Sequence, residues 1–225
     1  MFPFRQLLIL ASALIVTAFL VGTARADTIT IVGATSGQAS TATVVCEFNS
    51  QTNTLTFTIT NTSAITSPTS TSTITGIGFD LPPTGNASSS GLNGFTGIQA
   101  PSLSSTFTFS DADLGNVPGA NFQNAVLDFG FTTGPSGNFS GGSPNDGLAP
   151  GESASFTVTG AAFTGFTASQ ICNSILVRFQ NVPQPFGSDV GTPSGVPEPS
   201  AMLLLGTALV GLGSFTRKWK SNRRK

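Results

Sequence analysis

The side chains that could carry out chemistry in this chain are few, and the two cysteines are the most reactive of them. Cys46 and Cys172 lie far apart in a chain of 225 residues. Cys46 alternates with Val44 and Phe48, a pattern that predicts a strand with these three side chains on one buried face. The chain contains no histidine, so no imidazole is available to activate either thiol as a nucleophile.

Carboxylates are the other candidates, because two facing carboxylates can hydrolyse a glycosidic bond and several can hold Ca²⁺. Asp111 and Asp113 alternate in a predicted loop and are the candidate metal ligands, although the twelve-residue spacing of a calcium loop is missing. Solvated turn carboxylates are the alternative for this pair. Nothing in the spacing of the acidic residues selects a catalytic pair; these residues are Glu47, Asp80, Asp111, Asp113, Asp128, Asp146, Glu152 and Asp189.

The composition of the region from Asp27 to Gly195 excludes several classes of function. It contains neither histidine nor lysine, which removes the Ser-His-Asp triad, imidazole metal sites and lysine Schiff bases. Nine acidic residues and one basic residue, Arg178, give it a net charge of −8. A segment with this charge cannot hold a phosphate backbone. We therefore expect no nucleic-acid binding, no cofactor and no enzymatic activity.

The first 26 residues have the three parts of a secretory signal peptide. Arg5 provides a basic start, residues 7–22 are apolar, and Ala24 and Ala26 form a small-x-small cleavage site. Cleavage there would make Asp27 the first residue of the mature protein. The expected partners are the secretion machinery and signal peptidase, and the alternative is a retained membrane anchor.

The C-terminal region combines a Pro-Glu-Pro strip, an apolar span and a basic tail. Residues 201–216 form a predicted transmembrane helix, of which residues 201–215 contain no charge. Such a stretch rises about 22 Å as a helix, less than the roughly 30 Å of a bilayer core, which fits a transient anchor better than a permanent one. Basic flanks stay on the cytoplasmic side of a membrane, so the region between the two ends is expected outside. The tail contains Arg217, Lys218, Lys220, Arg223, Arg224 and Lys225.

This order of motif, span and tail resembles the PEP-CTERM sorting signal of Gram-negative bacteria, and Val196, Pro197, Glu198 and Pro199 carry the motif. The resemblance covers only residues 196–225. It implies recognition by an exosortase, a membrane-embedded transpeptidase-like enzyme, and removal of the tail. It also implies export across the inner membrane, transient anchoring there, and delivery to the cell surface or extracellular matrix of bacteria that make exopolysaccharide and biofilm. An ordinary single-span anchor is the alternative.

Export changes the interpretation of the two cysteines, because the periplasm is an oxidising compartment. The sequence therefore predicts one disulfide, between Cys46 and Cys172. Two separate buried thiols are the alternative. A disulfide would close a long loop and so limit the conformational freedom of the unfolded chain.

Alternation of apolar and polar residues is the main pattern between residues 28 and 180. In the segment 54–60, Leu55, Phe57 and Ile59 would point to one face and threonines to the other, which predicts a half-buried strand. Turns rich in Pro and Gly separate about eight such segments, a pattern typical of an all-β, antiparallel, Ig-like β-sandwich with phenylalanines in its core. The predicted strands are 28–32, 41–48, 54–60, 73–80, 105–110, 125–131, 153–160 and 171–180.

The sequence thus predicts four parts: a signal peptide at 1–26, a secreted β-sandwich at 27–182, a Pro/Gly/Ser linker at 183–195 and a sorting signal at 196–225. The main functional hypothesis is a non-enzymatic surface or matrix protein that is sorted by an exosortase and associates with exopolysaccharide or biofilm. A Ca²⁺- or carbohydrate-binding surface module is the alternative, and a carboxylate-dependent hydrolase is the third hypothesis.

Overall fold

The computed structural model describes residues 26–65, 71–82, 94–100, 107–111, 114, 117, 127–134, 139 and 141–194. Residues 1–25 of the predicted signal peptide and the whole predicted sorting signal at 196–225 lie outside these residues. The described residues consist largely of strands and turns, as the alternation of apolar and polar side chains predicts.

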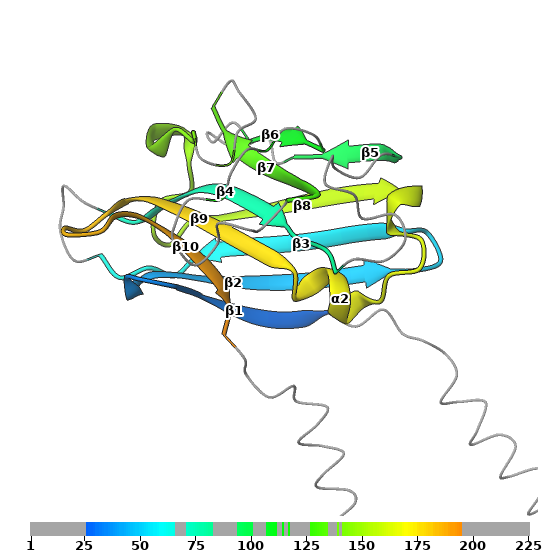
Figure 1. Cartoon of the computed structure of the whole chain (residues 1–225), viewed down its shortest axis with the longest axis horizontal. Coiled ribbons are helices and arrows are strands. Elements are labelled where there is room, and N and C mark those ends of the chain that lie inside the picture. Colours follow the sequence, from blue (N-terminus) through cyan, green and yellow to red (C-terminus); the bar gives the residue numbers. More distant parts are fainter. Residues whose placement is uncertain are drawn as a thin grey trace, which may run out of the picture. The chain divides into compact units, whose positions relative to one another are not determined.

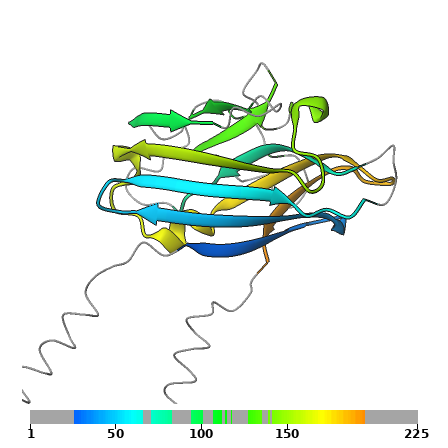
Figure 2. The same cartoon turned by 180° about the vertical axis from the view of Figure 1, so that it is seen from behind.

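Ten strands of the described residues form one antiparallel sheet (Figures 1 and 2). Along the sheet the order is β5-β8-β3-β2-β1-β10-β9-β4-β7-β6. The strands are β1 (Asp27–Gly33), β2 (Gly37–Asn49), β3 (Thr54–Asn61), β4 (Thr73–Phe79), β5 (Phe95–Gln99), β6 (Phe107–Ser110), β7 (Phe129–Thr133), β8 (Ser153–Gly160), β9 (Ile175–Val182) and β10 (Gly187–Pro193).

The sheet is nearly closed and barrel-like, because its two edge strands approach each other. Phe95 of edge strand β5 contacts Phe109 of edge strand β6, with ring centroids 5.3 Å apart. Phe107 of β6 also meets Phe156 of β8, at 5.4 Å between centroids. β5 and β6 are consecutive in sequence but stand at opposite ends of the strand order. The chain therefore passes from one edge of the sheet to the other between them.

The all-β antiparallel prediction is confirmed, but the Ig-like sandwich of about eight strands and the linker at 183–195 are wrong. β10 lies inside the predicted linker, and it pairs with β1 on one side and β9 on the other. Without β10 the strand order would divide into two sheets, which is the arrangement of a sandwich. Glycine is required in this strand because a Cβ on Gly191 would lie only 2.6 Å from Ile31 Cγ2. The resulting composition, rich in small residues, is also typical of a linker, so the sequence pattern did not indicate a strand.

Two further elements differ from the prediction. β5 is not among the predicted strands, and the strand predicted over 171–180 begins only at Ile175. Residues before it form the short helix α2 (Ala168–Cys172), which starts with a capping box. The Thr167 hydroxyl accepts from the Gln170 N–H, and the Gln170 side chain accepts from the Thr167 N–H. These two bonds satisfy donors that would otherwise be free at the helix start.

Phenylalanine rings fill the space inside the sheet. Phe57 of β3 stacks on Phe156 of the adjacent β8, with centroids 4.9 Å apart. It also meets Phe131 of β7 edge-on at 6.0 Å, and so joins the two halves of the sheet. Each such pair adds about 0.5–1.5 kcal/mol beyond the burial of its area. The sequence predicts nine phenylalanines of the core, of which Phe109 is partly buried. The other eight are buried: Phe48, Phe57, Phe79, Phe107, Phe129, Phe131, Phe156 and Phe179.

A second, smaller apolar layer covers the outer face of the sheet around β4. Phe139 packs where Gly76 and Gly78 leave room, since a Cβ on either residue would lie 3.1 Å from its ring. Every residue of β4 is buried, because the strand has the main core on one face and this layer on the other. We call this cluster the outer layer; it consists of Leu114, Val117, Leu127, Phe139, Leu176 and Val190.

We expect the secreted domain to need β10. A mature chain ending at Ser194 should unfold in one cooperative thermal transition, whereas a chain ending at Val182 should show none. The reason is that loss of β10 divides the sheet and exposes the facing edges of β1 and β9. Circular dichroism melting of both chains measures the difference. A transition with a similar midpoint in the shorter chain would contradict this role of β10.

Candidate functional site

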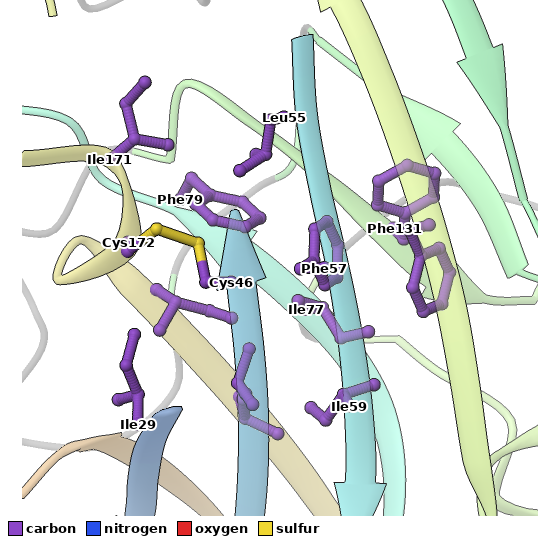
Figure 3. Close-up of a cluster of buried hydrophobic side chains, with 14 of the residues drawn as sticks. Ile29, Cys46, Leu55, Phe57, Ile59, Ile77, Phe79, Phe131, Ile171 and Cys172 are labelled. Carbon is purple, nitrogen blue, oxygen red and sulfur yellow. A yellow bond between two sulfur atoms is a disulfide. The ribbon is translucent and has the colours of Figure 1, made fainter. Parts of the chain in front are cut away.

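The disulfide attaches helix α2 to the middle of the sheet (Figure 3). Cys172 is the last residue of α2, and Cys46 lies on the inner face of β2. Their sulfur atoms are bonded at 1.97 Å and their Cα atoms are 5.9 Å apart. Both side chains are buried in the main core beside Phe79. The bond spans 126 residues of sequence, and it is consistent with an oxidising, extracytoplasmic compartment.

Among the acidic residues, the structure brings Asp80 and Asp128 together where β4 ends and β7 begins. The Asp128 N–H donates to the Phe79 carbonyl at 2.8 Å, and Asp128 Oδ2 accepts from the Leu81 N–H at 2.8 Å. Burial raises the pKa of Asp128 to about 6; the Leu81 hydrogen bond opposes this shift and the charge of Asp80 adds to it. Burial also raises the pKa of Asp80.

Among the described acidic residues, Asp80 and Asp128 most resemble the pair of carboxylates that a hydrolase requires. However, Asp128 is only 3% exposed and one of its oxygens already accepts a backbone N–H. Its side chain therefore secures the end of β4 against the start of β7. The charge of Asp80 and the raised pKa of Asp128 are therefore features of a contact that holds the two strands together.

Asp189 of β10 secures the other end of the central strands. Its Oδ2 accepts from the Ser36 N–H at 2.7 Å and the Ser36 hydroxyl at 2.6 Å, in the turn between β1 and β2. The Thr35 N–H donates to the same oxygen at 3.1 Å. Burial raises the pKa of Asp189, but these hydrogen bonds outweigh that effect and leave its pKa below the ordinary value. The carboxylate thus ties β10 to the β1–β2 turn.

The structure does not assemble the other acidic residues into a site. Asp111 follows β6, while Asp113, the second candidate metal ligand, lies outside the described residues. Within the described ranges, no group of three or more His, Cys, Asp or Glu side chains could hold a metal ion. Glu152 accepts from the Ala149 N–H at 2.8 Å in a turn, and Glu47 is exposed on β2.

One buried polar site, at Arg178 of β9, has no counterpart among the sequence predictions. Alternation places Val177 and Phe179 in the core and Arg178 on the outer face, yet Arg178 is only 6% exposed. Arg178 Nε, Arg178 Nη1 and Thr132 Oγ1 are the buried side-chain polar atoms, within the part of the chain described, that have no hydrogen-bond partner. The only sequence signal for this site is that Arg178 is the sole basic residue between Asp27 and Gly195.

The structure also defines where the chain enters and leaves the folded domain. β1 begins at Asp27, and β10 ends at Pro193, which lies opposite Ile31 of β1. Because the two strands are antiparallel, the chain enters and leaves at the same end of the sheet. No helix in the described part of the chain has the length and apolar character to cross a membrane. The predicted helix at 201–216 lies outside that part.

The described residues thus form a disulfide-bonded β domain that ends shortly before the C-terminal motif in the sequence. Residues 195–218 match the model of the PEP-CTERM protein-sorting motif. The chain therefore carries a PEP-CTERM sorting motif, and this motif implies export, exosortase processing and sorting to the cell surface. No curated protein and no solved structure matches the chain, so its β domain is not assigned to a family.

We expect the disulfide to stabilise the domain strongly. Replacing both Cys46 and Cys172 by Ala should lower the free energy of unfolding by up to about 5 kcal/mol, because the bond restricts a long loop in the unfolded chain. Urea unfolding under oxidising conditions measures the change. Reduction of the wild-type protein provides the control and should give the same loss; an unfolding curve that reduction leaves unchanged would contradict the prediction.

We expect Asp128 to make stability fall as pH rises from about 4 to 6. Its pKa is higher in the folded protein than in the unfolded chain, so the folded state holds the proton more tightly over this range. Asp128→Asn should stabilise the protein by about 1–3 kcal/mol at pH 7 and by little at pH 4. Urea unfolding at several pH values tests this.

Asp189→Asn is the matched control for this experiment, because the folded state lowers the pKa of Asp189. Its carboxylate stabilises the fold above the unfolded pKa of about 4, and this contribution is lost as pH falls through the lower folded pKa. The Asp189 variant should therefore be destabilised at pH 7. If both substitutions changed the free energy of unfolding at pH 7 by the same amount and sign, the opposite pKa shifts of Asp128 and Asp189 would be contradicted.

Proposed function

We propose that this protein is a non-enzymatic component of the cell surface or extracellular matrix of a Gram-negative bacterium. In this proposal the signal peptide directs export across the inner membrane, and the apolar span 201–216 holds the C-terminus there transiently. An exosortase then processes the chain near Pro197-Glu198-Pro199 and releases the β domain to the surface, where it associates with exopolysaccharide or biofilm. The observation that carries the proposal is the PEP-CTERM motif at residues 195–218.

The ends of the domain support this pathway. The predicted signal peptide ends at Ala26, and β1 begins at the next residue, Asp27. At the other end, Pro193 completes β10 shortly before the matched motif begins at residue 195. Both membrane-directed segments thus connect to adjacent central strands at one end of the sheet, which suits a domain held outside between two cytoplasmic basic flanks.

The exposed face of β3 and β8 supports a role as a hydrated matrix component. Four cross-strand pairs of hydroxyl groups run along these strands, among them Thr58 with Ser155 at 2.7 Å and Thr60 with Ser153 at 2.7 Å. The other two pairs are Thr54 with Thr159 and Thr56 with Thr157. This face is uncharged and rich in hydroxyl groups, while the region as a whole carries a net charge of −8. Such a surface remains soluble and resists collapse onto other anionic chains.

Composition supports the absence of catalysis in this proposal. The secreted region lacks the histidine and lysine that most acid–base and nucleophilic mechanisms use. Asp80 and Asp128, which interact electrostatically, lie at the junction of β4 and β7, where Asp128 accepts a backbone hydrogen bond from Leu81.

The sorting pathway predicts a change of mass that depends on the exosortase. Protein recovered from cells with a functional exosortase should have lost its C-terminal segment beyond about Pro199, and protein from cells without the enzyme should retain it. Intact-mass spectrometry distinguishes the two forms. Replacing Pro197-Glu198-Pro199 by three alanines should leave the tail uncleaved, whereas Asn222→Ala, which lies beyond the matched residues, should not. A complete tail in all samples would show a plain membrane anchor instead.

A further inference from the structure

Arg178 presents an unbalanced positive charge inside the outer layer of the domain. Arg178 is only 6% exposed, and burial lowers its pKa without an offsetting contribution from any described carboxylate. Asp189 lies next to Val190, the cross-strand partner of Arg178, but its carboxylate is occupied by Thr35 and Ser36. A guanidinium does not deprotonate in proteins, so its burial must be compensated by hydrogen bonds and by negative charge.

The residues around Arg178 provide only part of that compensation. In the amide orientation that satisfies both ends of the Gln180 side chain, Gln180 Oε1 accepts from Arg178 Nη2 at 3.1 Å. Gln180 Nε2 then donates to the Gly142 carbonyl at 2.6 Å and to the Thr75 hydroxyl at 3.1 Å. Arg178 Nε and Nη1 remain without partners. The site therefore contains unused donors and one full positive charge.

A second unpaired donor lies in the same row of the sheet. Gly76 of β4 stands opposite Arg178 of β9 on one side and opposite Thr132 of β7 on the other. Residues directly opposite each other in a sheet project from the same face. The side chains of Arg178 and Thr132 therefore both project into the outer layer, on either side of Gly76. Thr132 Oγ1 is fully buried and also lacks a partner.

We propose that the outer layer at Arg178 binds a small monovalent anion, of the size of a halide ion or a single carboxylate group. The donors left unused are N–H and O–H groups, which together with the guanidinium charge select an anion. The burial of Arg178 and of the adjoining Phe139, which is 0% exposed, limits the ligand to a small one. An extended polyanion is disfavoured, because the surrounding region carries a net charge of −8.

Chloride is the probe for the test, which uses the full-length protein purified in a non-ionic detergent. Sodium gluconate, whose six-carbon anion exceeds the size limit proposed for the site, is replaced stepwise by sodium chloride at constant ionic strength, and the melting temperature is recorded. We expect a saturating rise of about 3–6 °C by the time chloride reaches ten times its dissociation constant. A parallel series with sodium acetate shows whether a carboxylate occupies the same site. A melting temperature that responds to neither anion would overturn the proposal.

Arg178→Met removes the charge but keeps a long side chain, and it should abolish the rise. Lys220→Met removes the same charge from the C-terminal tail and should leave the rise unchanged. An equal rise in the Arg178 variant and the wild type would contradict the assignment. If the Arg178 variant does not fold, anomalous diffraction from wild-type crystals soaked in bromide decides the question. A bromide peak within hydrogen-bonding distance of Arg178 Nε or Nη1 supports the site, and water alone there overturns it.

Discussion

The pairing of β10 with β1 and β9 is the constraint on which the rest of this structure depends. It joins what would otherwise be two sheets into one, and it brings the last strand of the domain beside the first. Closure of the sheet then lets the rings of β3, β7 and β8 meet across the interior. Such pairing of distant segments delays folding until the chain is nearly complete. The disulfide between Cys46 and Cys172 opposes this delay, because it restricts the loop that these long-range contacts must close.

The same pairing determines how the folded domain connects to its sorting signal. Pro193 ends β10 directly before the matched residues 195–218, so no long flexible spacer separates the sheet from the motif. A strand at the centre of the sheet has both its edges hydrogen-bonded, and it is among the last parts of a domain to open. A tail attached to such a strand leaves the fold at a fixed place. In the proposed pathway, processing near Pro199 would remove the tail without disturbing the pairing that holds the domain together.

Much of the fold follows from sequence patterns that depend on two-residue periodicity. Leu55, Phe57 and Ile59 alternate without a break, and the strand that contains them is present in the structure as predicted. β10 could not be found in this way, because Gly191 must avoid Ile31 and Asp189 must reach the β1–β2 turn. Both requirements come from segments more than 150 residues away. The omission of this one strand turned a continuous sheet into a predicted sandwich.

The outer layer escaped prediction for a related reason. Alternation in β9 assigns Arg178 to the outer face, and the outer face of a sheet ordinarily meets water. Here another part of the chain covers that face, since Phe139 packs over Gly76 and Gly78. The main core contains phenylalanine rings and aliphatic side chains that require no polar partner. Polar groups without a hydrogen-bond partner, on Arg178 and Thr132, therefore lie under the outer layer, on either side of Gly76. A periodic pattern identifies which face a residue occupies, but only the three-dimensional arrangement shows that the face is covered.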